Sequence, residues 1–217
     1  MTSHIARETE KLKRRLLTLS ADVEETYLLA VRALEERDEE LAKQVAGSDD
    51  RIDRQEVDIE EECLKVLALH QPVANDLRFI VSVMKINNDL ERIGDMAVNI
   101  AERALDLMAA EPMEIPFEFA EMSQKVYAMV KKSLDSLVKL DLQEAHEVIA
   151  LDDEVDALHH KSYAMVIERI RQQPDNIEAL ISYLVVSRYL ERIADLATNI
   201  AEDVHYLIEG DIVRHIM

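Results

Sequence analysis

Carboxylate side chains spaced four residues apart are the first feature of this chain that could do chemistry. Glu91 and Asp95 lie in the run ERIGDMAVNIAE, and Glu191 and Asp195 lie in the run ERIADLATNIAE. Residues four apart share one face of a helix. Several carboxylates without a thiolate form a hard-oxygen ligand set, suited to Mg²⁺, Mn²⁺, Ca²⁺ or ferric iron. The spacing therefore predicts cation binding.

The acidic run occurs twice, one hundred residues apart, and nine of its twelve positions are identical. Self-similarity of this kind indicates two structurally equivalent units. The correspondence extends upstream, where residues 38, 49 and 53 match residues 141, 152 and 156, all of them aspartates. The two copies also share an asparagine, Asn99 and Asn199. The chain therefore carries a pair of equivalent polar sites.

Height along a helical hairpin brings the acidic pairs to one level. Asp49 and Asp53 precede the Gln71-Pro72 turn by about as many residues as Glu91 and Asp95 follow it. At about 1.5 Å per residue, both pairs lie roughly 30 Å from the turn. The second half has the same arrangement. Its two acidic pairs, Asp152 with Asp156 and Glu191 with Asp195, lie at matching distances from the turn at Gln173.

Whether these side chains converge is left open by the helical wheel. The alternative is a solvated acidic face, or acids paired with Lys85, Arg92 or Arg192. Recurrence in both halves at matched heights favours a metal site in each half.

Composition predicts that long helices position these acids. The 217 residues include only three Gly and four Pro, and strong helix formers are abundant. We expect six helices, with breaks at Gln71-Pro72, at the linker 111–116 and at Gln173-Pro174. The expected ranges are 5–36, 38–70, 72–109, 117–140, 141–172 and 175–210. Asp38 and Asp141 are expected N-caps, and Asp175 with Glu178 resembles a capping box.

An apolar seam follows the repeated helices. In the first copy, apolar residues alternate spacings of four and three from Ile86 to Leu107, and the row recurs from Val186 to Val204. This spacing is typical of helical bundles. The sequence thus predicts an all-α fold of two tandem pseudo-symmetric three-helix bundles, with domains at residues 1–111 and 112–217.

Charge and cysteine content exclude several classes of function. A formal net charge of −20 repels nucleic acid and anionic membrane surfaces. One cysteine, Cys63, excludes an internal disulfide and fits a reducing cytosol, and its apolar helical row indicates a buried side chain. The charged N-terminus is no signal peptide, and no apolar stretch is long enough to span a bilayer.

Three features stand out together: the paired acidic segments, the ERIGD and ERIAD cores, and the closing run Gly210-Asp211-Ile212-Val213-Arg214-His215. In these features the chain resembles the PhoU family of bacterial phosphate-signalling regulators. The resemblance covers nearly the whole chain. It implies a multinuclear metal cluster on each bundle, of iron, manganese, magnesium or zinc. The implied ligands are Asp49, Asp53, Glu91, Asp95 and Asn99 in the first half, and Asp152, Asp156, Glu191, Asp195 and Asn199 in the second.

The family further implies a non-enzymatic negative regulator of the phosphate-starvation response. Its expected partners are the ATPase subunit of the phosphate ABC transporter and a PhoR-type sensor histidine kinase. The expected location is cytoplasmic, held at the inner face of the membrane through these partners, and a homodimer is expected from an exposed apolar strip. The alternatives are a metal-dependent enzyme and a purely structural acidic scaffold. The second half departs where His159 replaces Glu56 and Arg188 replaces Asn88, so its metal site is expected to differ.

Overall fold

The computed structural model describes residues 2–211, which form seven α-helices, one short 3-10 turn and no strand. The prediction of an all-α fold is confirmed. The closing run from residue 212 onward lies outside the described residues. The elements are α1 (Thr2–Glu36), α2 (Glu39–Ala46), α3 (Asp49–His70), α4 (Ala74–Ala109), α5 (Phe119–Lys139), α6 (Leu142–Gln172), η1 (Pro174–Asn176) and α7 (Ile177–Glu209).

The expected helix from Asp38 to His70 is interrupted between α2 and α3. Its N-cap is confirmed, because the Asp38 side chain accepts from the Leu41 amide at 3.0 Å. The break falls at Gly47 and Ser48, where glycine costs about 1 kcal/mol of helix propensity relative to alanine. In α6, the equivalent positions hold Ala and Leu at 150 and 151, and the helix runs through them. The break makes Asp49 the first residue of α3.

The start of α7 also differs from the prediction. Asp175 lies within the 3-10 turn η1, and the N-cap of α7 is Asn176, which makes no side-chain capping bond. Pro174 opens that turn, so the expected capping box of Asp175 with Glu178 does not form. By contrast, the Asp141 cap of α6 is confirmed. The Asp141 side chain accepts from the backbone amides of Gln143 and Glu144, at 2.8 and 3.3 Å.

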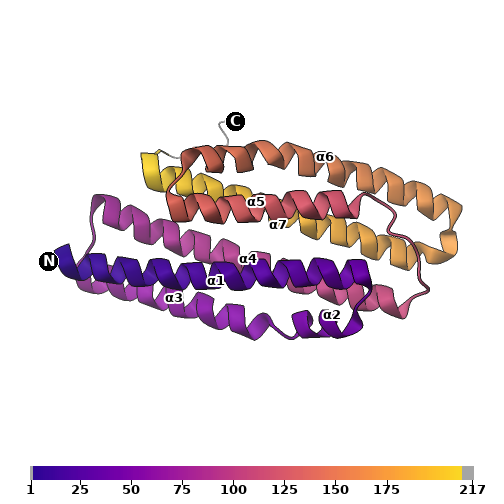
Figure 1. Cartoon of the computed structure of the whole chain (residues 1–217), viewed down its shortest axis with the longest axis horizontal. Coiled ribbons are helices and arrows are strands. Elements are labelled where there is room, and N and C mark those ends of the chain that lie inside the picture. Colours follow the sequence, from indigo (N-terminus) through magenta and orange to yellow (C-terminus); the bar gives the residue numbers. More distant parts are fainter. Residues whose placement is uncertain (1, 212–217) are drawn as a thin grey trace.

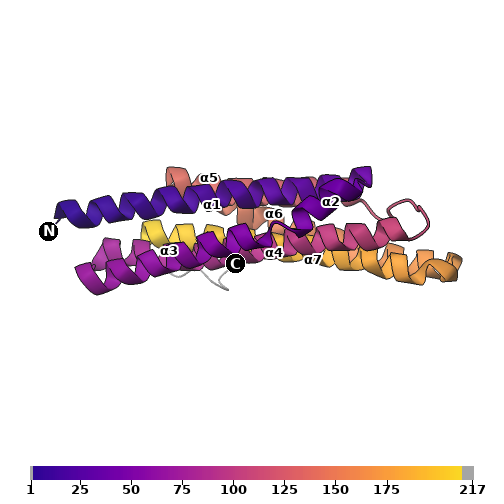
Figure 2. The same ribbon diagram turned by 90° about the horizontal axis from the view of Figure 1, so that it is seen from below.

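Two helical units lie side by side and point in opposite directions (Figure 1). One unit comprises α1 to α4 and the other α5 to α7. The turn between α3 and α4 lies at one end of the molecule, and the turn between α6 and α7 lies at the other. Helices α4 and α7 run antiparallel in contact, as do α1 and α5, while α3 and α6 occupy opposite edges. Figure 2 shows that the assembly is elongated and flat.

The predicted apolar seams of α4 and α7 are buried. Each seam residue from Ile86 to Leu107, and from Val186 to Val204, is no more than 3% exposed. Together with apolar side chains of the other α-helices they form one continuous cluster that extends through both units. Polar contacts also join the units. Tyr27 donates its hydroxyl hydrogen to the carbonyl of Ser123 at 2.8 Å, and Lys85 Nζ lies 2.9 Å from Asp203 Oδ1.

Cys63 lies inside the first unit, with no exposed surface. Burial raises the pKa of its thiol to about 12, with smaller contributions from Glu62 and Glu60. The side chain therefore packs as a small apolar group, as its position in the sequence predicts. Among the described residues, no helix combines the length and the apolar character needed to cross a membrane.

Candidate metal centre

Three carboxylates of the first unit meet where α3 begins beside the middle of α4. Asp49, Asp53 and Asp95 each place one oxygen within 4.8 Å of the other two. The first two lie one turn apart at the N-terminus of α3, and Asp95 approaches from α4. Three of the four acids predicted for this half therefore converge, a point that the helical wheel had left open.

Glu91 is the fourth acid of this group, and its raised pKa shows the crowding. Burial, followed by the charges of Asp95, Asp53, Glu56 and Asp49, raises the pKa of Glu91 to about 7. Burial also raises the pKa of Asp95, followed by the charges of Asp49 and Asp53. Like charges gathered in a partly buried site are unfavourable. A proton or a cation would relieve that repulsion.

Glu56 is an acid of this site that the predicted ligand set left out. Asn87 of α4 is buried and donates its amide to Glu56 Oε1 at 3.0 Å and to the Glu56 carbonyl at 2.9 Å. Burial is the main cause of the raised pKa of Glu56, with the charges of Glu60 and Asp53 adding to it. Its position three residues after Asp53, on the same helical face, was the available signal.

Gly94 allows α3 and α4 to approach closely at this site. A Cβ atom at Gly94 would lie 2.8 Å from Ile52 Cδ1 and 3.2 Å from its Cγ2, and Ile52 is buried between Arg51 and Asp53. In the second unit the equivalent pair is Ala194 with Val155, so the added methyl on one helix accompanies a smaller side chain on the other. The glycine therefore sets the spacing across which the carboxylates meet.

The second unit holds a looser cluster. Burial and the charges of Asp156 and Asp195 raise the pKa of Asp152 to about 6, and the nearby Thr198 hydroxyl opposes this rise. The pKa of Asp195 is raised by burial and then by Glu191. The four predicted acids therefore lie near one another. Yet within residues 2–211, no three acids of this unit approach as closely as the first-unit trio.

Arginine neighbours account for part of this difference. Arg192 places Nη1 3.8 Å from Asp195 Oδ2 and Nε 4.0 Å from Glu191 Oε2. Its first-unit equivalent, Arg92, lies 3.9 Å from Asp89 instead. The alternative reading, in which acids pair with arginines, thus applies in part to the second cluster.

A second exchange changes the polar support of that cluster. His159 occupies the position of Glu56, and its Nδ1 lies 2.8 Å from the hydroxyl of Ser187, which stands where the first unit has Asn87. Burial lowers the pKa of His159, as do the charges of His160 and Arg188. A neutral imidazole is a ligand for softer divalent ions such as Zn²⁺. The expected difference between the two sites therefore extends to their supporting residues.

The two asparagines in the predicted ligand sets lie differently. Asn99 donates its side-chain amide to the carbonyl of Asp95, one turn earlier, at 2.8 Å. This contact holds the Asn99 side chain along its own helix. Asn199 instead lines a cavity beside Asp195. Neither joins the group of three close carboxylate oxygens.

The donor groups fit hard cations. Ions such as Mg²⁺, Mn²⁺ and Ca²⁺ bind oxygen ligands at about 2.0–2.6 Å, so oxygens on opposite sides of one ion lie about 4–5 Å apart. The first trio meets this requirement without a large rearrangement. In the second unit, Asp152 Oδ1 and Glu191 Oε2 are buried and accept no hydrogen bond from the described residues. A cation would neutralise these groups and tie α3 to α4 and α6 to α7.

Comparison with known proteins places this geometry in a family. The family model described as the PhoU domain matches the chain twice, at residues 16–104 and 119–204. The chain belongs to the PhoU family. Each match contains one complete set of the predicted acids. A protein of Aquifex aeolicus named as a phosphate-specific transport system accessory protein PhoU homolog is 42% identical to this PhoU-family chain over 96% of it and 95% of the relative. A Pseudomonas aeruginosa homolog of the same name is 38% identical over 100% of this chain and 91% of the relative.

Solved structures of PhoU proteins share the fold. The crystal structure of PhoU from Pseudomonas aeruginosa aligns with a TM-score of 0.90 at 37% identity, covering 95% of this chain and 99% of that one. A phosphate transport system regulatory protein PhoU from Streptococcus pneumoniae aligns with a TM-score of 0.84 at 31% identity, covering 96% and 99%. The resemblance to PhoU, and the two tandem three-helix units that it implies, are therefore confirmed.

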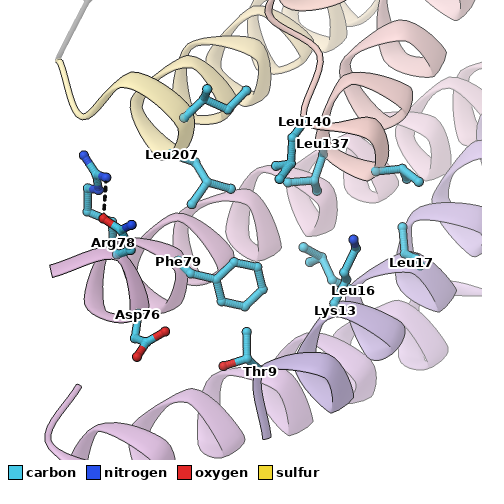
Figure 3. A pocket seen from close by; sticks show the side chains of 13 residues that line it. Thr9, Lys13, Leu16, Leu17, Asp76, Arg78, Phe79, Leu137, Leu140 and Leu207 are labelled. Carbon is cyan, nitrogen blue, oxygen red and sulfur yellow. Dashed lines mark hydrogen bonds between the residues drawn. The ribbon is translucent and has the colours of Figure 1, made fainter. Parts of the chain in front are cut away.

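An apolar cavity of about 410 Å³ lies apart from the acids, at one end of this PhoU-family chain (Figure 3). It is bounded by the start of α1 and α4 and the end of α5 and α7, and Phe79 and Leu207 point toward it. At its edge Arg78 donates to Asn75 Oδ1 at 2.7 Å. None of the ten predicted metal ligands lines this cavity.

Proposed function

We propose that this protein is a non-enzymatic, metal-binding accessory protein that regulates a phosphate-specific transport system. Its relatives are named as accessory proteins of that system, and the chain matches them over nearly its whole length. The observation that best supports metal binding is the approach of three carboxylate oxygens from two helices to within 4.8 Å. The proposed cations are iron, manganese, magnesium or zinc, bound in one multinuclear cluster per unit.

In this proposal the metal acts on the scaffold. Carboxylates that repel one another would otherwise push α3 from α4 and α6 from α7. Bound cations would hold each pair of helices at a fixed spacing and present a local positive charge on an acidic surface. The long helical faces would then bind a transporter ATPase subunit and a PhoR-type sensor kinase at the cytoplasmic side of the membrane. A homodimer is part of the same proposal.

Metal content tests the first part. Protein purified without chelators should contain metal, and the double variant Asp95→Ala, Asp195→Ala should lose most of it, because each substitution removes a central carboxylate. The matched control is Asp50→Ala, Asp153→Ala. It removes one exposed acid beside Asp49 on α3 and one beside Asp152 on α6. Elemental analysis of the three proteins provides the measurement. Equal metal in the wild type and the Asp95, Asp195 variant would refute the assignment.

Chelation separates the two remaining classes of function. A metal-dependent adaptor should lose binding to the transporter ATPase in a pull-down after exhaustive chelation and regain it when metal is restored. A purely structural scaffold would bind equally well before and after chelation. A metal-dependent enzyme would show turnover with a candidate substrate, and that turnover would stop on chelation.

A further inference from the structure

A groove between α4 and α7 gathers positive charge on a protein of net charge −20. Arg92 reaches it from α4, and Arg188 and Arg192 reach it from α7. The cavity has a volume of about 390 Å³. Acidic residues outnumber basic ones by 45 to 25 in the whole chain, so three arginines around one cavity reverse the local charge. Such a groove attracts anions that the rest of the surface repels.

The three guanidinium groups are available to a ligand. Within the described part of the chain, none of them donates a hydrogen bond, and their nearest carboxylate contacts are long. Arg92 lies 3.9 Å from Asp89 and Arg192 lies 3.8 Å from Asp195. Both side chains are about half exposed, at 52% and 49%. Arg188 has no carboxylate within 4.0 Å among residues 2–211, and its charge acts on both Asp195, where it opposes the raised pKa, and His159, where it helps to lower the pKa.

The second unit supplies the larger share of the positive charge in this groove. The pseudo-twofold relation between α4 and α7 exchanges Arg92 with Arg192, so this pair contributes one arginine from each helix. The third arginine and the neighbouring Tyr189 have no such equivalents, because Asn88 and Asp89 occupy those positions. The α7 side therefore carries two arginines and a phenol, and the α4 side carries one arginine, an amide and a carboxylate.

We propose that this arginine groove binds inorganic phosphate. Guanidinium groups match phosphate oxygens with paired donors. Three arginines with one aspartate leave a net charge of two, which balances a phosphate dianion. Tyr189 and Asn199 at the walls add neutral donors. Asp195, the one acid in the lining, supplies an acceptor for the proton that phosphate keeps at neutral pH. Sulfate has no such proton, so the groove should prefer phosphate to sulfate.

This inference deepens the proposed function by naming a ligand beside the second acidic cluster, and it can be tested without any metal. Phosphate is titrated by calorimetry into the full chain in excess chelator at physiological ionic strength. The wild type should bind phosphate, and Arg188→Gln and Arg192→Gln should each weaken it by about tenfold or more, as loss of a hydrogen bond to a charged group predicts. Arg171→Gln, at an exposed position at the end of α6, is the matched control and should leave binding unchanged.

Two further comparisons make the assignment specific. Sulfate should bind more weakly than phosphate, and Asp195→Asn should reduce that difference, because an amide can donate to sulfate. Circular dichroism melts of each variant exclude unfolding as the cause of lost binding. The proposal is overturned if the wild type binds no phosphate, or if the arginine variants bind as tightly as the control. A chain that binds phosphate in chelator but never contains metal would refute the metal proposal and leave this one standing.

Discussion

Protonation of single carboxylates links stability to pH in the first cluster. Glu91 has an ordinary pKa of 4.5 that burial and neighbouring acids raise to about 7 in the folded chain. Between these values the folded state binds more protons than the unfolded state, so stability falls as pH rises. Asp152 adds a smaller effect of the same sign, up to about pH 6. Above about pH 7 these groups are ionised in both states, and the dependence ends.

We therefore predict that the metal-free protein becomes less stable from about pH 4.5 to pH 7, and that Glu91→Gln makes this fall shallower because the amide cannot ionise. Chemical denaturation in chelator at several pH values measures the slope. Glu102→Gln, at a position on α4 outside the cluster, is the control and should keep the wild-type slope. An unchanged slope in Glu91→Gln would show that this group does not titrate as inferred.

Paired exchanges at the residue scale explain how one motif gives two sites. Glu56 with Asn87 in the first unit becomes His159 with Ser187 in the second, and each pair keeps a hydrogen bond between the two helices. The sequence repeat predicted equivalent positions but not these bonds, because Asn87 and Ser187 lie outside the acidic motif. Their partners come from the other helix of each hairpin, and only the fold brings them together.

At the scale of the helices, the closest packing at Gly94 gives a direct test. Replacing this glycine by alanine adds about 1 kcal/mol of helix propensity but forces a contact with buried Ile52, and overpacking costs about 1–3 kcal/mol. We predict that Gly94→Ala is destabilising alone and about 1–2 kcal/mol more favourable when Ile52→Val is also present, since the pair then matches Ala194 with Val155.

A double-mutant cycle measured by denaturant unfolding gives the coupling between these positions. The control background is Leu67→Ile, a substitution on α3, the helix of Ile52, but far from the contact. Gly94→Ala should show no coupling with it. Strict additivity of Gly94→Ala and Ile52→Val would mean that the helices adjust without strain. In that case Gly94 would not set the spacing of the carboxylates.

Helix boundaries show which features of the chain are readable from sequence. The Gln71-Pro72 and Gln173-Pro174 breaks were predicted, because proline cannot continue a helix and the interruption is local. The split at Gly47 was missed because a single glycine is often tolerated within a helix. The level of the acids followed from counting residues to the turn. Their convergence did not, since it depends on how α3 starts after that split and on the close approach at Gly94.

The whole molecule behaves as one unit in its packing. Buried side chains of both three-helix units form one continuous cluster, and α4 lies directly against α7. We predict a single cooperative thermal transition, with the calorimetric and van't Hoff enthalpies equal. Differential scanning calorimetry of the metal-free chain tests this. Two resolved transitions would mean that residues 1–111 and 112–217 fold as independent domains.

Separating the halves provides the matching experiment. Either fragment alone would expose the apolar surface that α4 and α7 bury against each other, and a large exposed apolar patch favours association or unfolding. Mixing the two fragments should therefore restore helical content that neither shows alone, measured by circular dichroism. Full helicity in each isolated fragment would contradict this expectation.

The antiparallel pairing of α4 with α7 has a consequence for the origin of the molecule. Two identical copies of a half-length chain, joined as these units are, would form a dimer with a true twofold axis that passes through this contact, perpendicular to both helices. In such a dimer every side chain near the axis occurs twice, so the positions held here by Asn88 and Arg188 would carry the same residue. Fusion of the two copies into one polypeptide removes that restriction. Only a fused chain can place two arginines on one side of its own symmetry axis and one on the other.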